Sequence, residues 1–199
     1  MQLDNSTFEQ KAALRARALI ALGVKPVVIE THGGFGRIFS RCYSHVSDGI
    51  VFETDPAKAD ALAIQRPSWG VYQTDSEIAL ADGVGAHLEA NVLDCDPYGE
   101  PWPVIEAFFS TSRPFARRMV LVVNDGLRHK TKLSGGWNVH SMQPAVEHFG
   151  NVLGKKYLEV CEWMVRRISA RVGYRVTKWT GYYCGKKKAM THYAALLER

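Results

Sequence analysis

Acidic residues recur in the first half of the chain wherever a short apolar run ends. The first of them, Glu30, is followed by a glycine-rich segment that contains Gly33, Gly34 and Gly36. Glycine lets the main chain turn tightly and approach a ligand that a side chain would keep away. A carboxylate at such a turn can meet a cationic amino group, whereas a buried carboxylate without a partner would be costly. This combination predicts that Glu30 and the glycines bind a ligand.

Spacing assigns a second acidic residue to the same ligand. Glu53 lies 19 residues after Gly34, and a spacing of about 20 residues is typical of an acidic side chain that hydrogen-bonds a ribose hydroxyl. We therefore expect Glu53 to bind a ribose. Asp55, which precedes Pro56, more simply begins a helix as its capping residue. Asp75 has two interpretations of similar weight: its carboxylate can accept the exocyclic amine of adenine, or it can cap the next helix.

A third group of residues, Asp96, Pro97, Tyr98 and Gly99, follows the fourth apolar run and suits a different role. The carboxylate of Asp96 and a main-chain carbonyl can accept the hydrogens of an amine on a flat base, and the ring of Tyr98 can stack on that base. The same residue types also form tight turns. Because the group stands at the end of a fourth run, we favour a catalytic role for Asp96, Pro97 and Tyr98.

The elements that position these residues follow from the alternation of apolar runs with helical patterns. This alternation predicts an α/β fold with helices around a mainly parallel sheet, closed by an antiparallel C-terminal hairpin. Ligands bind such sheets beyond the carboxyl ends of the strands, which is where the acidic residues fall. Strands are expected at residues 26–30, 49–53, 69–73, 91–95, 119–123, 174–184 and 189–197, and a long loop at 127–143. Helices are expected at 7–22, from 37, at 56–65, 76–88, 101–110 and 144–171, where the last one can be broken near Gly150 or Gly154.

Length and composition restrict the class of protein. A chain of 199 residues, 46% hydrophobic and 23% charged, is expected to fold as one domain over residues 1–199. No stretch has the roughly 18 apolar residues of a membrane helix, and the first residues do not resemble a secretory leader, so we expect a cytoplasmic protein without a membrane partner. The four cysteines lack CxxC pairing and zinc-type spacing, so we expect neither a metal site nor a disulfide framework.

Charge is distributed unevenly along the chain. Residues 1–100 contain 8 basic and 14 acidic residues, whereas residues 101–199 contain 17 and 6. A polyanionic partner and a merely solvated basic surface explain this asymmetry equally well. The basic residues of the expected loop flank the predicted site and are the better candidates for phosphate contacts. For the three lysines in the hairpin turn, the simpler interpretation is that they are solvated or protect a sheet edge. The loop residues are Arg128, His129, Lys130 and Lys132, and the turn residues are Lys186, Lys187 and Lys188.

With these residues in place, the chain resembles the class I S-adenosylmethionine-dependent methyltransferases over nearly its whole length. The segment from Glu30 to Gly36 is similar to their acidic, glycine-rich first motif, which holds the methionine part of the cofactor. Glu53 and Asp75 resemble the acidic residues of the second and third motifs, next to the ribose and the adenine. His32 stands where the family often has a small residue; it can pack against the cofactor, although a structural role is favoured. The resemblance implies S-adenosylmethionine as cofactor and a Rossmann-like, seven-stranded sheet with a reversed last strand.

The segment that begins at Asp96 resembles the fourth motif of the amino-group methyltransferases that act on nucleic acids. It is most similar to the Asp-Pro-Phe/Tyr-Gly-x-Pro form of the tRNA guanine N2-dimethyltransferases, whose final proline is matched by Pro101. This resemblance implies RNA or DNA as the substrate and an exocyclic amine of a base as the methyl acceptor. Asp96 would then orient the amine, Pro97 would present its carbonyl, and Tyr98 would stack on the base.

Three alternatives remain open at this point. A nicotinamide dehydrogenase would share the glycine turn and Glu53, but it needs a third small residue where this chain has Phe39. The same fold can methylate a protein or a small molecule. A non-catalytic binding module with a degenerate cofactor site is the third alternative, and the joint presence of Glu30, Glu53 and Asp96 makes it less attractive.

Overall fold

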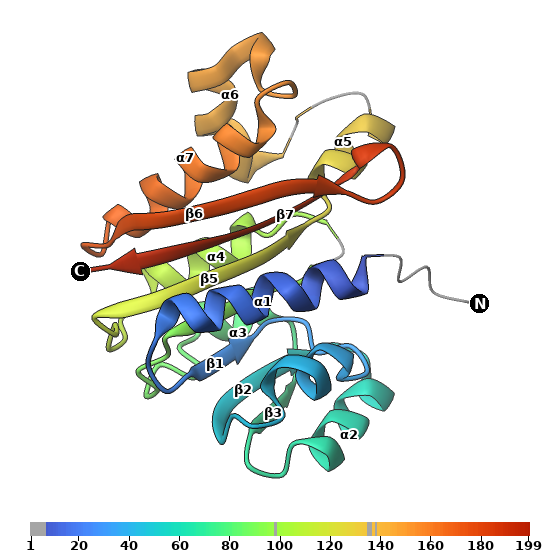
Figure 1. Cartoon of the computed structure of the whole chain (residues 1–199), viewed down its shortest axis with the longest axis vertical. Coiled ribbons are helices and arrows are strands. Elements are labelled where there is room, and N and C mark those ends of the chain that lie inside the picture. Colours follow the sequence, from blue (N-terminus) through green and yellow to red (C-terminus); the bar gives the residue numbers. More distant parts are fainter. Residues whose placement is uncertain (1–6, 98, 135–136, 138) are drawn as a thin grey trace.

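The computed structural model describes residues 7–97, 99–134, 137 and 139–199, and a seven-stranded sheet runs through this part of the chain (Figure 1). The strand order is β3-β2-β1-β4-β5-β7-β6. β7 runs antiparallel to its neighbours β5 and β6, and the remaining neighbours are parallel. The predicted fold class, including the closing hairpin, is confirmed. The strands are β1 (Val27–Glu30), β2 (Asp48–Glu53), β3 (Gly70–Gln73), β4 (Val92–Cys95), β5 (Arg118–Asp125), β6 (Arg175–Cys184) and β7 (Met190–Glu198).

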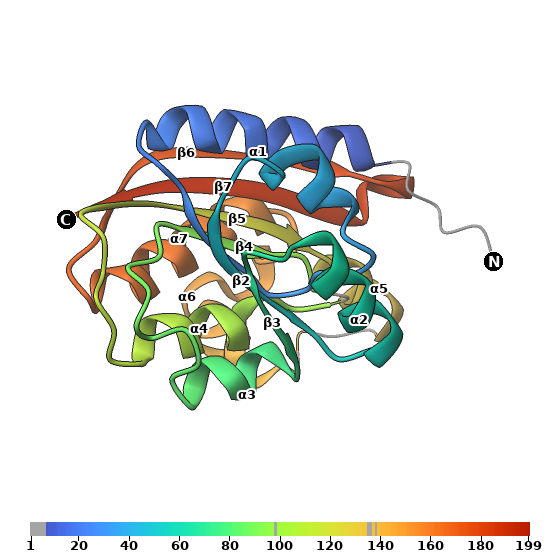
Figure 2. The ribbon, with the colours of Figure 1, turned by 90° about the horizontal axis from the view of Figure 1, so that it is seen from below.

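Helices cover both faces of the sheet (Figure 2). One face carries α1 (Phe8–Leu22), the single π-helical turn η1 (Phe39–Tyr43) and α2 (Pro56–Gln65). The other face carries α3 (Ser76–Ala81), α4 (Trp102–Ser110) and α7 (Tyr157–Ala170). The smaller elements are α5 (Leu127–Ser134), α6 (Gln143–Phe149) and the 3-10 turns η2 (His140–Met142), η3 (Gly150–Val152) and η4 (Lys186–Lys188).

The central strands are apolar on both faces because helices cover both of their sides. Val28 of β1 and Val92 of β4 pack toward α1, while the next residues along, Ile29 and Leu93, pack toward α4 and α7. Successive side chains of a strand point to opposite faces, so each strand serves both layers of the core. This alternation also fixes which polar residues at the strand ends lie under α1.

Local signals set most of the helix boundaries as expected. The Asp55 side chain accepts a hydrogen bond from the Lys58 amide at 3.1 Å, which caps α2 ahead of Pro56. α1 ends at Gly23, whose φ of 69° lies in the left-handed region that glycine adopts readily. The helix expected at 144–171 is divided into α6, η3 and α7, with the break at Gly150, whose φ is 50°.

Two other expected elements differ from the structure. Residues 127–143, predicted as a loop, contain the helix α5 and the turn η2. The Asp125 carboxylate accepts a hydrogen bond from the Leu127 amide at 2.7 Å, and this local contact helps to start α5. The helix expected as far as Leu88 ends at Ala81, because Gly83 and Gly85 follow with φ of 84° and 75°. Among the described helices, none combines the length and apolar character required to cross a bilayer.

Candidate active site

The carboxyl ends of β1, β2 and β4 lie side by side at one edge of the sheet. Glu30 is in register with Val51 of β2 and with Asp94 of β4. The main chain continues this contact beyond the strands, because the Gly33 amide donates to the Phe52 carbonyl at 3.0 Å. Glu30 and Glu53, the first two acidic residues predicted for the site, therefore lie on neighbouring strands at the carboxyl edge of the sheet.

The glycine bend after β1 uses its three glycines for different purposes. A Cβ at Gly33 would come within 2.6 Å of Leu62 and Val51, and one at Gly36 would lie 2.1 Å from Gln65. These two positions allow the bend to pack closely on α2. Gly34 has a φ of 54°, and a Cβ there would meet nothing within 4 Å. Gly34 is thus the position at which the bend faces open space, where a ligand can approach the main chain.

Glu53, at the end of β2, holds the bend in place. Its carboxylate accepts hydrogen bonds from the main-chain amides of Gly34 at 2.8 Å, Thr54 at 3.0 Å and Asp55 at 3.1 Å. Asp75 caps α3 by accepting from the amides of residues 77 and 78. Both carboxylates are bound by amides, and no basic side chain neutralises them within the described contacts. Their negative charge therefore remains available to a cationic ligand.

His32 lies among the acidic residues that the sequence assigned to the site. Burial lowers the pKa of His32, while the nearby carboxylates of Asp96, Glu53, Asp75 and Asp94 each act to raise it. Its Nδ1 lies 2.7 Å from the Thr31 hydroxyl. The parallel registers of β1 with β2 and β4, and of β2 with β3, place the carboxyl ends of these four strands at one edge of the sheet, where His32 lies.

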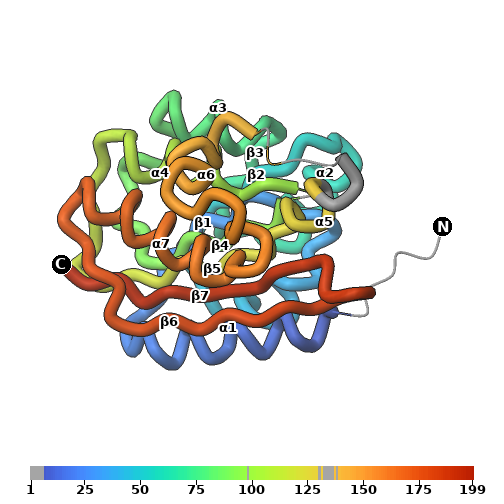
Figure 3. Tube along the Cα trace, turned by 90° about the horizontal axis from the view of Figure 1, so that it is seen from above, coloured from blue at the N-terminus to red at the C-terminus, as the bar shows by residue number. Residues whose placement is uncertain are grey.

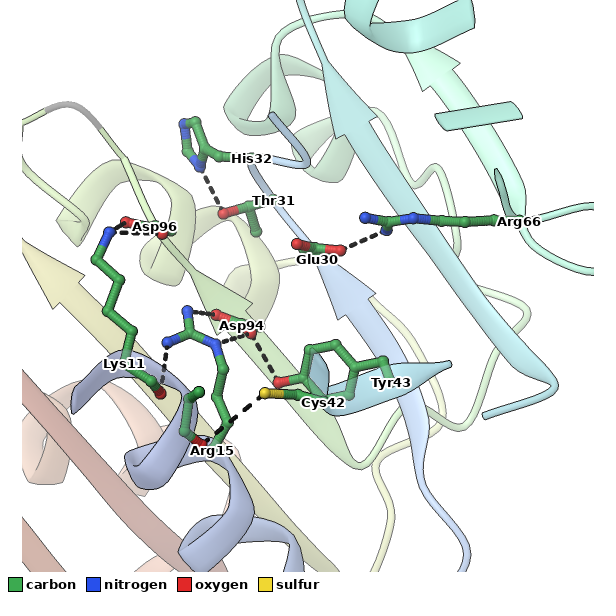
Figure 4. A network of polar contacts seen from close by, with 11 residues as sticks. Lys11, Arg15, Glu30, Thr31, His32, Cys42, Tyr43, Arg66, Asp94 and Asp96 are labelled. Carbon is green, nitrogen blue, oxygen red and sulfur yellow. Dashed lines mark hydrogen bonds and ion pairs between the residues drawn. The ribbon is translucent and has the colours of Figure 1, made fainter. Parts of the chain in front are cut away.

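Glu30 points away from open space and into the protein (Figure 4). It is 2% exposed and forms a buried ion pair with Arg66, whose guanidinium lies over the rings of Phe39 and Trp69. Burial raises the pKa of Glu30 to about 7, against the opposing influence of Arg66. In this structure Arg66 therefore occupies the Glu30 carboxylate, and the amino group of a ligand would not reach it without a rearrangement.

Asp94 of β4 forms a second buried ion pair directly beside Glu30. Arg15 of α1 donates to both Asp94 oxygens at 2.6 and 2.7 Å, and the Tyr43 hydroxyl donates to the same carboxylate at 2.7 Å. All three side chains are at most 1% exposed. Burial alone would lower the pKa of Arg15, but Asp94 and Tyr43 hold it above its usual value. This triad fixes α1 against the end of β4 (Figure 4).

Asp96, just beyond β4, binds the other basic residue of α1. Lys11 Nζ contacts both Asp96 oxygens at 2.8 and 2.9 Å, and the two side chains are 16% and 23% exposed. Burial acts to raise the pKa of Asp96, but Lys11 and Arg15 outweigh it and leave the pKa below its ordinary value. The carboxylate is therefore ionised and reachable. Pro97 follows it in a buried position, and Tyr98 lies outside the described residues.

Two buried polar residues beside Asp96 were missed by the sequence analysis. Asn124 of β5 and His192 of β7 are in register and are both 0% exposed. Within the described part of the chain, the Asn124 amide and His192 Nε2 have no hydrogen-bond partner of good geometry, although Asn124 is near enough to help lower the pKa of Asp96. Burial, together with Lys11, lowers the pKa of His192 to about 4, so this imidazole is neutral at pH 7.

Asp125 lies at the end of β5 on the opposite face of the sheet. It is 0% exposed and accepts a hydrogen bond from the Tyr157 hydroxyl at 2.8 Å. Burial raises the pKa of Asp125 to about 7. These contacts join β5 to α7. Arg128, in the predicted loop, donates to the Lys188 carbonyl and so supports the hairpin turn. His129 is exposed, and the side chains of Lys130 and Lys132 lie outside the described part of the structure.

No protein-family model and no curated protein matches this sequence. The structure is similar to Trm1 from Pyrococcus horikoshii in complex with S-adenosyl-L-methionine, with a TM-score of 0.68, 10% identity, and coverage of 98% of this chain and 55% of Trm1. It is also similar to N-methyltransferase NodS from Bradyrhizobium japonicum in complex with S-adenosyl-L-homocysteine, with a TM-score of 0.64, 11% identity, and coverage of 99% and 89%. TYW2 from M. jannaschii in complex with AdoMet gives a TM-score of 0.58 at 10% identity, with coverage of 100% and 78%.

These likenesses assign the chain to a class of fold. The strand order and the reversed β7 are those of a Rossmann-like methyltransferase, and the match extends over almost the whole chain. The chain spans 55% of the length of Trm1. At identities of 10–11% the comparisons establish the fold, and the activity has to be argued from the site.

Proposed function

We propose that this protein transfers a methyl group from S-adenosylmethionine to an exocyclic amine of a nucleic-acid base. The observation that carries the proposal is a glycine bend that is open at Gly34 and held by Glu53 at 2.8 Å, at the same edge of the parallel sheet as the ends of β3 and β4, which lead to Asp75 and Asp96. A sulfonium nucleoside is cationic and carries a ribose and an exocyclic amine. Carboxylates at these positions match all three features. The fold supports the choice of cofactor, because Trm1 and NodS, which share it, were crystallised with this cofactor or its product.

The residues present have the chemistry to hold this cofactor. The Gly34 main chain can lie close to it, Glu53 can accept ribose hydroxyls in addition to its amide bonds, and Asp75 can accept the adenine amine. When bound, the cofactor supplies an electrophilic methyl group on a sulfonium. Glu30 does not contact it directly in this arrangement, since Arg66 occupies its carboxylate.

Asp96 is suited to orient the acceptor. A carboxylate with a lowered pKa stays ionised and accepts the hydrogens of an amine, which directs the nitrogen lone pair and stabilises the positive charge that develops there. The Pro97 carbonyl follows immediately and can accept a second hydrogen. Lys11 already occupies the Asp96 carboxylate, so a cationic alkyl amine would have to compete with a like charge. A neutral amine on a base avoids this repulsion.

A transfer assay tests the proposed function. Purified protein with S-adenosylmethionine labelled in its methyl group is expected to label tRNA, rRNA or DNA, and to bind S-adenosylhomocysteine in a calorimeter. Transfer to a protein or a metabolite, with none to any polynucleotide, would refute the nucleic acid acceptor. Failure to bind S-adenosylhomocysteine at all would refute the cofactor as well.

Replacing Gly34 with alanine is expected to weaken S-adenosylhomocysteine binding at least tenfold. The added methyl group would project into the open space of the bend, and the φ of 54° would cost roughly 1 kcal/mol for a residue other than glycine. Gly83→Ala is the matched control, because Gly83 also has a positive φ of 84° and its Cβ would meet only Ala86, at 3.9 Å. Equal binding by both variants would remove Gly34 from the cofactor site.

A further inference from the structure

The exposed edge of the sheet carries a row of basic residues. β6 is the last strand in the order and has only β7 as a neighbour, so its other edge is open. Residues 175–188 contain five basic residues and no acidic one. All five are exposed. We call them the β6 track, which consists of Arg175, Lys178, Lys186, Lys187 and Lys188.

The carboxylates near this edge do not cancel its charge. β7 and α7 are packed against β6 and contribute three glutamates to its surroundings. Each of these glutamates is held by a basic side chain, so the pairs are close to neutral and the β6 track stays positive. The pairs are Glu198 with Arg118, Glu162 with Arg166, and Glu159 with Lys156.

One end of the track opens into a basic cavity. A cavity of about 1130 Å³ lies at the amino-terminal ends of the parallel strands and is lined by Arg175 together with Arg117, Arg118 and Arg199. Within the described contacts, Arg117 and Arg175 form no ion pair. Asp48, Glu89 and Glu198 line the same cavity, but Lys25 and Arg118 pair with Asp48 and Glu198, so the lining at this far end of the sheet from Asp96 keeps a net positive charge.

The other end of the track is held in a conformation that lysine seldom adopts. Lys187 and Lys188 have φ of 54° and 53°, in the left-handed region. Arg128 stabilises this turn by donating to the Lys188 carbonyl and by stacking over Tyr183 at 4.2 Å. Lysines that only protect a sheet edge need their charge but not a strained main chain. The strained turn therefore indicates a second role for these lysines.

The track ends close to the proposed acceptor site. The Tyr182 hydroxyl of β6 donates to the Gln10 carbonyl at 2.9 Å, and Gln10 is followed by Lys11, which binds Asp96. Figure 3 shows the hairpin between β6 and β7 on the side of the molecule where α1 begins. At about 3.3 Å per residue, β6 extends for roughly 30 Å between the basic cavity and this site. A single polymer of modest length can contact both ends.

We propose that the β6 track binds a single-stranded nucleic acid and leads it to Asp96. This inference rests on the proposed function, because it supplies the path by which the acceptor base reaches the site. Phosphates at regular intervals match a row of lysines and arginines that follows one strand. The half-buried ring of Tyr182 lies on the α1 face of the same strand, and a ring of this kind favours a polymer that carries bases over an acidic peptide.

Fluorescence anisotropy with fluorescein-labelled rU12 and dT12, without any methyl donor, tests the track. For single strands, the logarithm of the binding constant falls with the logarithm of salt concentration by about 0.7 for each phosphate contact. The double variant Arg175→Gln/Lys178→Gln is therefore expected to reduce the slope by about 1.4 and the affinity roughly tenfold near 0.1 M salt. Lys186→Gln/Lys188→Gln is expected to act similarly.

Arg37→Gln/Arg41→Gln is the matched control. It removes the same charge from exposed residues near η1, beside β1 and β2 rather than β6, and is expected to change the affinity less than twofold. Circular dichroism checks that all variants are folded. The track is overturned if wild-type protein does not bind rU12, if the control weakens binding as much as the β6 variants, or if an oligoglutamate peptide of matching length binds as tightly as rU12. β6-dependent binding without methyl transfer would overturn the proposed function alone.

Discussion

Replacing Arg15 with methionine is expected to lower the free energy of unfolding by about 3–5 kcal/mol. The guanidinium is 0% exposed and forms two short hydrogen bonds with Asp94, which is itself 1% exposed. Methionine fills a similar volume but leaves the Asp94 carboxylate buried with only the Tyr43 hydroxyl as partner. An unpaired buried charge is far more costly than the loss of one hydrogen bond. Urea denaturation followed by circular dichroism measures the change.

The double variant Arg15→Met/Asp94→Leu separates the cost of the unpaired charge from any effect of altered packing. Removing both charges leaves only the Tyr43 hydroxyl without its partner, so the double variant is expected to recover most of the stability lost by Arg15→Met alone. Lys25→Gln, which breaks an exposed pair with Asp48, serves as the surface control and is expected to change stability by about 1 kcal/mol or less. A loss for Arg15→Met no larger than that of the surface control would contradict the buried pair.

The sequence predicted the strand ends because their signals are local. Apolar runs of four to five residues, such as the one that ends at Glu30, are bounded by glycine, proline or acidic residues, and parallel strands place their carboxyl ends at one edge. Gly34 and Glu53, whose spacing assigns them to one ligand, also contact each other through a hydrogen bond of 2.8 Å. The ribose role of Glu53 stays a prediction.

The basic partners of the site escaped sequence analysis because their contacts are non-local. Lys11 and Asp96 are 85 residues apart, Arg15 and Asp94 are 79 apart, and Arg66 and Glu30 are 36 apart. One usable signal existed on α1. Arg15 follows Leu14 and precedes Ala18 on the face that is buried against the sheet, and Lys11 lies four residues earlier on the same side. A basic residue within an otherwise apolar helix face requires an acidic partner.

Other features could not be assigned without coordinates. The residues after β5 are polar and basic, a composition that also suits a loop. The helix α5 forms there with the Leu127 amide bound to the Asp125 carboxylate. Asn124 and His192 lie in strands whose pattern is apolar, and only the antiparallel register of β5 with β7 brings them together beside Asp96. Register between distant strands depends on the packing of the whole sheet.

Replacing Asp96 with alanine is expected to lower kcat/KM for methyl transfer at least 100-fold while the affinity for S-adenosylhomocysteine changes less than threefold. The carboxylate orients the acceptor amine and stabilises positive charge that appears only as the bond to the methyl group forms, so its removal affects the transition state more than cofactor binding. The stability loss should be small, because the pair that Asp96 forms with Lys11 is partly exposed at 23% and 16%. Single-turnover transfer and calorimetry measure the two effects separately.

Two further variants identify what the carboxylate contributes. Asp96→Asn keeps a carbonyl oxygen that can accept a hydrogen from the amine but removes the charge, so its rate is expected to lie between those of the wild type and Asp96→Ala. Asp60→Asn, at an exposed position on α2, makes the same change of charge outside the site and is expected to retain the wild-type rate. An Asp96→Ala variant as active as Asp60→Asn would show that the acceptor is oriented by other groups. Asn124 and His192 would then be the residues to replace next, because the Asn124 amide and His192 Nε2 have no hydrogen-bond partner among the described residues.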